Sequence, residues 1–172
     1  MDLMDENLEF WLSGPLPNIP ALLQPAAHAL LQSERELKKY TSNFPKELLW
    51  AKASGRASVG FHMNHLTGVL DRMLTYAKGE SLSVEQFNFL KQEGTFNLET
   101  DVEQLREQFS LKVAEALHYF ETIPENSLTD KRTVGRKQLP STVIGLLFHA
   151  AEHSQRHIGQ LLVTISVLQS KI

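Results

Sequence analysis

Apolar residues recur every three or four positions along four long stretches of the chain. This spacing places them on one face of an α-helix, because a helix turns about 100° per residue. The pattern predicts long helices at residues 19–40, 58–78, 98–122 and 140–168, and a short helix at 83–93. No stretch shows the alternation and turn signals of a β-hairpin. We therefore predict an all-α protein, a four-helix bundle of the up-and-down type with short extra helices.

Individual residues predict where these helices begin. Ser58 and Ser83 are suitable N-caps, because a serine hydroxyl accepts a free backbone N–H of the first turn. Pro25 predicts that the first helix either starts late or bends. Pro140 fits the first turn of the last long helix, and residues 124–139 predict a polar loop before it.

Length, composition and charge narrow the classes of protein. A chain of 172 residues with 42% apolar residues predicts a single domain over residues 1–172. The net charge of −3 argues against nucleic-acid binding, which needs clustered positive charge. No apolar run approaches the roughly 20 residues that cross a bilayer, so we expect no membrane partner. The acidic opening, MDLMDENLEFW, differs from a basic signal peptide, and we expect a cytoplasmic protein.

The chain has no cysteine but seven histidines, five of which fall in two short windows. In HAAEHSQRH, His149, His153 and His157 are four residues apart and form one stripe along a helix. In GFHMNH, His62 and His65 are three residues apart on another predicted helix. The lack of cysteine excludes disulfides, thiolate ligands and cysteine nucleophiles. The seven histidines are the one unusual count in the composition, so their positions guide the search for a functional site.

Two histidines at i and i+4 can chelate one metal ion from successive helical turns. His153, His157 and a histidine of the second helix would form a three-histidine site of the catalytic type, with a position left open for water or substrate. The spacing does not choose between His62 and His65. The alternative is a helical interaction protein that binds no metal, in which the histidines share this stripe by coincidence.

Other metal and nucleotide motifs do not fit. A zinc protease motif needs glutamate directly after its first histidine, whereas Ala150 and Ser154 stand at those positions. Ferritin-like di-iron sites need two Glu-x-x-His motifs, and only Glu115-x-x-His118 is present. The glycine-rich nucleotide motifs and the serine-hydrolase elbow do not occur.

Two segments together resemble the DinB-like (DinB/YfiT) superfamily of bacterial metal-binding four-helix bundles. They are SVGFHMNHLTGVLDRMLTYAKGE and VGRKQLPSTVIGLLFHAAEHSQRHIGQL. The resemblance implies a divalent metal ion held by His65, His153 and His157, with zinc or nickel expected first and iron or manganese as alternatives. The family's histidine sits in an (I/L)-x-x-H-(L/I) setting, which favours His65 over His62. By the same match, His149 is a pocket residue or a neighbour of the ligands.

The resemblance also implies an activity. Characterised members resemble thiol transferases that use bacillithiol or mycothiol, and the related maleylpyruvate isomerases use mycothiol. It therefore implies a metal-dependent thiol S-transferase, with a low-molecular-weight thiol and an electrophile as partners. A metal-dependent hydrolase and a non-catalytic metal-binding bundle stay open as alternatives. A homodimer is one assembly that we consider.

Four further residues are candidates for the surroundings of the metal. Arg72 and Tyr76 point within about 20° of His65 on a helical wheel, which predicts that they line the pocket. A surface ion pair is the alternative for Arg72. Arg136 is expected either to meet an anionic substrate or to be solvated like its basic neighbours. Gln160 is expected to hydrogen-bond a ligand ring. Close helix contacts would explain three glycines inside helices, namely Gly68, Gly145 and Gly159.

Overall fold

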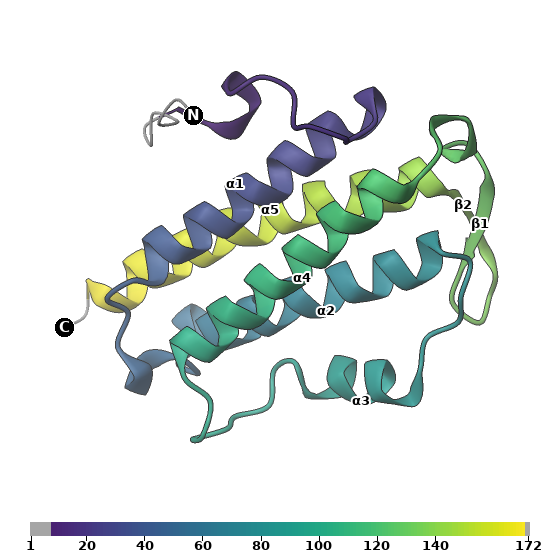
Figure 1. Cartoon of the computed structure of the whole chain (residues 1–172). Helices are drawn as coiled ribbons and strands as arrows, with labels where there is room; N and C mark the ends of the chain where they lie inside the picture. Colours follow the sequence, from purple (N-terminus) through teal and green to yellow (C-terminus); the bar gives the residue numbers. More distant parts are fainter. Residues whose placement is uncertain (1–7, 171–172) are drawn as a thin grey trace.

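The computed structural model, which describes residues 8–170, is mostly helical, as predicted. Four long helices lie side by side (Figure 1). They are α1 (Gln24–Thr41), α2 (Val59–Ala77), α4 (Val102–Thr122) and α5 (Val143–Gln169), and the short helix α3 (Val84–Gln92) contacts α2. Two strands, β1 (Lys131–Val134) and β2 (Leu139–Thr142), form an antiparallel hairpin. The described residues also form short 3-10 turns at Phe10–Leu12, Ala21–Leu23, Lys46–Leu48, Ala53–Gly55 and Glu125–Ser127.

The long helices enclose one core, since α1 and α2 each pack against both α4 and α5. Contacts along α2 and α4 advance together: Lys112 Nζ lies 2.7 Å from Asp71 Oδ1, and Lys78 Nζ lies 5.3 Å from the centre of the Tyr119 ring. These two consecutive long helices are therefore parallel. The up-and-down order that we predicted is not confirmed. Helical periodicity gives the length of each helix but not the path of the connection, and the 78–101 connection brings the chain back before α4 begins.

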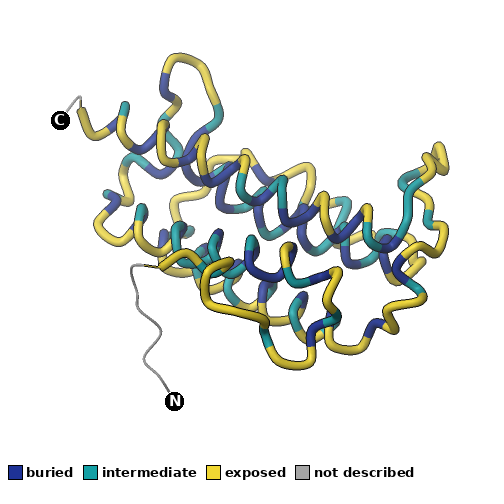
Figure 2. Tube along the Cα trace, turned by 90° about the horizontal axis from the view of Figure 1, so that it is seen from above, coloured by how far each residue is buried: buried dark blue, intermediate teal, exposed yellow. Residues whose placement is uncertain are grey.

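The buried residues follow the inward sides of the long helices, whereas the loops are mostly exposed (Figure 2). Phe109 and Phe120 of α4 are the largest side chains that are fully buried. Helix α3 contributes no buried residue between its ends. None of the described helices combines the length and apolar character that a membrane span requires.

Most helix starts follow from local hydrogen bonding. The predicted caps Ser58 and Ser83 both accept backbone N–H groups of the first turn, and Ser83 forms a full capping box. Pro25 lies in the first turn of α1, where no intrahelical N–H is needed, so this helix starts late rather than bending. Helix α4 starts at Val102, after the predicted position, because Asp101 is its N-cap.

The hairpin corrects two predictions. Residues 124–139 are not simply a loop, and Pro140 does not begin the last helix: it lies in β2 opposite Thr133. Helix α5 begins instead at Val143, capped by the hydroxyl of Thr142. Strands of four residues are too short to show a clear alternating pattern, and a proline is tolerated in a strand at a sheet edge.

Candidate metal centre

Three histidines from two helices come together in the structure. The candidate ligand atoms of His65 on α2 and of His153 and His157 on α5 all lie within 4.8 Å of one another. Nε2 of His65 is 3.0 Å from Nε2 of His153. The ring centre of His157 is 4.5 Å from those of both other histidines. Within residues 8–170, no other His, Asp or Glu joins this group.

Helix geometry and packing place the three rings. His153 and His157 are one turn apart on α5, so both face α2. Helix α2 runs antiparallel to α5: His65 meets His153, and His62 meets His157. Phe61 stacks on the His65 ring, with the ring centres 5.0 Å apart and the planes inclined by 16°.

The environment favours the neutral form of several rings. Burial, and then the nearby His65, lowers the pKa of His153 to about 4. The same two causes lower the pKa of His62 to about 4. Burial also lowers the pKa of His157, to about 3, with His65, His153 and His62 adding to the effect. These three rings are neutral at pH 7, and neutral imidazole is the form that binds metal ions.

The histidine cluster fits a divalent metal ion. Two ring nitrogens bonded to one ion at 2.0–2.1 Å stand roughly 3.0–3.4 Å apart, depending on the coordination angle. The observed separation of 3.0 Å between His65 Nε2 and His153 Nε2 agrees with this value. The buried Nδ1 of His153 also has no hydrogen-bond partner within the described part of the chain. A buried polar nitrogen without a partner is costly. An ion held at Nε2 would not bond this Nδ1, so the fit to a metal ion rests on the separation of the Nε2 atoms.

Two neighbours contact the triad from outside. His62 is buried, and its Nδ1 lies 2.9 Å from Nδ1 of His157. Glu93, at the end of α3, places Oε2 at 2.6 Å from Nδ1 of His65. The sequence interpretation missed Glu93. A single glutamate at the end of a short polar helix gives no signal of its own.

Arg72, Tyr76 and Arg136 do not line the histidine cluster. Arg72 is neither a pocket residue nor a surface residue: it is buried, and its Nη1 lies 2.7 Å from Oε1 of Glu93. Tyr76 is about 16 Å further along the α2 axis than His65, because a helix rises 1.5 Å per residue. It lines a cleft beside the hairpin together with Arg136, whose guanidinium lies 5.8 Å from the Phe87 ring.

Two further candidates lie at the edge of the cluster. The His149 ring centre is 5.1 Å from that of His153, and its side chain is 46% exposed. Gln160 lines an open cavity of about 630 Å³. His62, Arg56 and Arg156 also line this cavity. His62 connects it to the triad, because its Nδ1 lies 2.9 Å from Nδ1 of His157.

Of the three helix glycines, Gly68 alone lies at a close helix contact. A Cβ atom there would collide with Glu93 and would lie 2.7 Å from Nη1 of Arg72. At Gly159 a Cβ would have no atom within 4 Å, so the predicted contact is wrong there. At Gly145 a Cβ would meet the hydroxyls of the residues that precede the helix, not a second helix.

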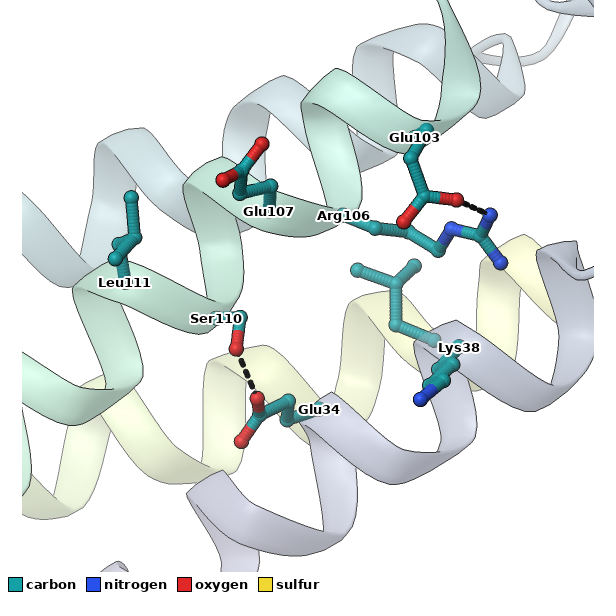
Figure 3. Close-up of a pocket in the computed structure, with 8 residues that line it drawn as sticks. Glu34, Lys38, Glu103, Arg106, Glu107, Ser110 and Leu111 are labelled. Atoms are coloured by element: carbon teal, nitrogen blue, oxygen red, sulfur yellow. Dashed lines mark hydrogen bonds and ion pairs between the residues drawn. The ribbon is translucent and has the colours of Figure 1, made fainter.

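A separate groove of about 550 Å³ lies between α1 and α4 and contains no histidine (Figure 3). Ser110 donates a hydrogen bond across it to Glu34, and Arg106 pairs with Glu103 within α4. Three of the charged residues that line the groove, Glu34, Glu103 and Arg106, thus have partners. The cavity beside His62 differs from this groove in that His62, which lines it, contacts His157 of the triad.

Comparison with known families agrees with the site. The family model of the DinB superfamily matches residues 29–161, a span that contains all three histidines of the triad. No curated protein matches the chain. The family match extends over most of the sequence and over all four long helices, except the first part of α1 and the last turns of α5. The chain belongs to the DinB superfamily.

Proposed function

We propose that this protein is a metal-dependent thiol S-transferase whose divalent ion is held by His65, His153 and His157. The observation that carries the proposal is the convergence of three histidines. Among residues 8–170, no fourth His, Asp or Glu places a ligand atom within 4.8 Å of all three. Catalytic zinc sites typically have three protein ligands and an open position, whereas structural sites have four. Zinc and nickel are the first candidates, because imidazole suits both.

The chemistry needs a sulfur nucleophile. A divalent ion bound by neutral imidazoles supplies Lewis acidity that lowers the pKa of an incoming thiol. The thiol proton passes to solvent, the sulfur bonds to an electrophilic carbon, and the leaving group departs with its bonding electrons. The protein contributes rings that stay neutral at pH 7, since burial lowers the pKa values of His153 and His157.

The cavity beside His62 is the proposed binding site for the reactants. Arg56 and Arg156 line it, together with the polar side chain of Gln160. Arg156 also pairs with Glu152, at 2.5 and 2.7 Å from its two carboxylate oxygens, which holds the guanidinium over this region. Guanidinium groups recognise carboxylates and phosphates, so a thiol or electrophile that carries an anionic group fits this lining.

The proposed setting is the cytoplasm of a bacterial cell, where low-molecular-weight thiols are kept reduced. A chain without cysteine cannot form mixed disulfides with such thiols. This property suits a protein that works at high thiol concentration.

The test is a conjugation assay with untagged protein loaded with zinc. Bacillithiol, mycothiol and glutathione are each offered with monochlorobimane, whose thiol adducts fluoresce. We expect at least one thiol to react faster with loaded protein than without it, and His65→Ala to lose this acceleration. His118→Ala is the matched control, because that histidine is exposed on α4 and distant from the triad in the fold.

A spectroscopic measurement separates a poor electrophile from a wrong mechanism. Protein loaded with Co²⁺ is titrated with the same thiols, and we expect a sulfur-to-metal charge-transfer band. If no thiol changes the cobalt spectrum or accelerates conjugation, the transferase proposal fails. A hydrolytic assay on the same loaded protein then tests the alternative.

A further inference from the structure

Glu93 joins the end of α3 to the candidate metal centre through both of its carboxylate oxygens. Oε2 lies 2.6 Å from Nδ1 of His65, and Oε1 lies 2.7 Å from Nη1 of Arg72. The side chain is only 3% exposed. A buried carboxylate requires partners, and here one partner is a guanidinium and the other is a ring of the triad.

The packing of α2 leaves space for this contact. A Cβ at Gly68 would collide with Oε1 of Glu93 and would lie 2.8 Å from the ring of Phe89. Glycine inside a helix weakens the helix, so its presence in the middle of α2 needs a compensating contact. The Glu93 carboxylate and its arginine partner occupy the volume that a larger residue would take.

The contacts of His65 define which of its nitrogens faces the triad. Its Nδ1 points to the Glu93 carboxylate, while its Nε2 points to His153. An ionised carboxylate only accepts hydrogen bonds, so Nδ1 must carry the proton. The lone pair then lies on Nε2, on the side of His153 and of the proposed ion.

We infer that Glu93 is a positioning residue that fixes His65 in the form with hydrogen on Nδ1. Arg72 holds the Glu93 carboxylate in place, and Gly68 leaves the space that the carboxylate occupies. The inference deepens the proposed function and rests on it for the identity of the bound ion. The His65 tautomer is a property of the metal-free protein, so it is measured independently of metal binding and of thiol chemistry.

Glu93→Gln is the sharpest variant, because it keeps the volume of the side chain. An amide has one oxygen, and Arg72 can only donate, so the oxygen turns to Arg72 and the NH2 group turns to His65. That arrangement donates to Nδ1 and moves the ring proton to Nε2. Nitrogen-15 NMR of the histidine rings in metal-free protein reports this change directly. We also expect zinc affinity to fall by roughly tenfold to a hundredfold.

Gly68→Ala provides a second variant that leaves Glu93 and Arg72 in the sequence. The new methyl group displaces the carboxylate, so we expect the Nδ1–H form of His65 to lose population and the zinc affinity to fall. Gly159→Ala is the matched control, since a Cβ there meets no atom within 4 Å. Glu152→Gln is the control for loss of a partly exposed carboxylate beside the histidine stripe. Both controls should keep the wild-type His65 signal.

The competing explanation is that Glu93 only anchors α3 to α2, where its backbone carbonyl also accepts from Asn64. That role predicts faster amide exchange in α3 of the variants with an unchanged His65 signal and unchanged zinc affinity. This outcome overturns the inference, as does a wild-type His65 with hydrogen on Nε2. If the wild-type protein binds no zinc, the proposed function fails, while the NMR result still decides the role of Glu93.

Discussion

Nε2 of His65 lies 3.0 Å from Nε2 of His153, although 88 residues separate them in the chain. The contact exists because α2 and α5 pack antiparallel, with His62 meeting His157 one turn away. The candidate metal centre is therefore a product of tertiary packing between two helices that each contribute a short histidine window. Changes that separate α2 from α5 will affect the site even if every histidine is kept.

His65 and His62 should respond differently to truncation. We expect His65→Ala to lower zinc affinity more than roughly hundredfold, because it removes a proposed ligand. Substitution of a residue that only hydrogen-bonds a ligand typically costs up to about hundredfold. His62→Ala removes the neighbour of His157 Nδ1 and should cost roughly tenfold to a hundredfold. Competition with a chromophoric chelator measures both. Equal losses in the two variants would contradict the assignment of His65 as the second-helix ligand.

The metal-free protein should lose stability as the pH falls from about 6.5 towards 5. The pKa values of His62 and His153 are lowered to about 4 and that of His157 to about 3, all by burial first. In this window the unfolded chain binds more protons than the folded protein, so the free energy of unfolding decreases with decreasing pH. Above the pKa of histidine in the unfolded chain, about 6.5, the rings are neutral in both states, and the full free energy of unfolding is retained.

Urea unfolding across this pH range measures the effect, and carboxylates stay mostly ionised there. A variant with His62, His153 and His157 all replaced by Gln should show a flatter profile. A wild-type stability that stays constant or rises on acidification would contradict the burial of neutral rings.

The hairpin should stabilise the end of α2 without affecting the metal centre. Nε of Arg132 donates to the carbonyl of Ala77 at 2.8 Å, at a helix C-terminus where carbonyls lack partners. Arg132→Ala should cost about 1 kcal/mol of unfolding free energy. Lys131→Ala, at an exposed position of the same strand, should cost less. Thermal unfolding and zinc competition on both variants test this; a loss of zinc affinity in Arg132→Ala would place the hairpin at the site.

The capping box of α4 should contribute about as much to the free energy of unfolding as other helix caps do. Oδ1 of Asp101 accepts from the backbone N–H of Gln104 at 2.9 Å, and the Gln104 side chain accepts from the Asp101 backbone. Asp101→Ala should cost about 1 kcal/mol, whereas Asp101→Ser should keep most of the stability. Denaturant titration distinguishes the two. Equal losses would show that the charge, and not the cap, is responsible.

The sequence predicts the parts of the site that depend on one helix. His153 and His157 share a face because of the helical repeat, and the resemblance to the DinB-like superfamily favoured His65 over His62. The wheel argument for Tyr76 was wrong because it compares angles and ignores distance along the axis. Glu93 was not found because its contact with His65 spans 28 residues and depends on how α3 docks.

The same distinction applies to the fold. The spans of the long helices followed from apolar spacing and capping residues such as Ser58. The parallel run of α2 and α4 depends on the connection through α3, which the apolar pattern does not describe. The hairpin at residues 131–142 was missed because each strand has only four residues, which is too few for a periodic signal.

The most direct test of the metal centre is the number of divalent ions bound per chain. Untagged protein is equilibrated separately with zinc, nickel, iron(II) and manganese and freed of loosely held metal by gel filtration. Bound metal is then measured by plasma mass spectrometry, and the fold by circular dichroism. We predict about one bound metal ion per chain in the wild type. A variant with His65, His153 and His157 all replaced by Ala should bind none while keeping its helical spectrum. A folded wild type that binds no zinc, nickel, iron or manganese, or a triple variant that keeps the full equivalent, would contradict the account.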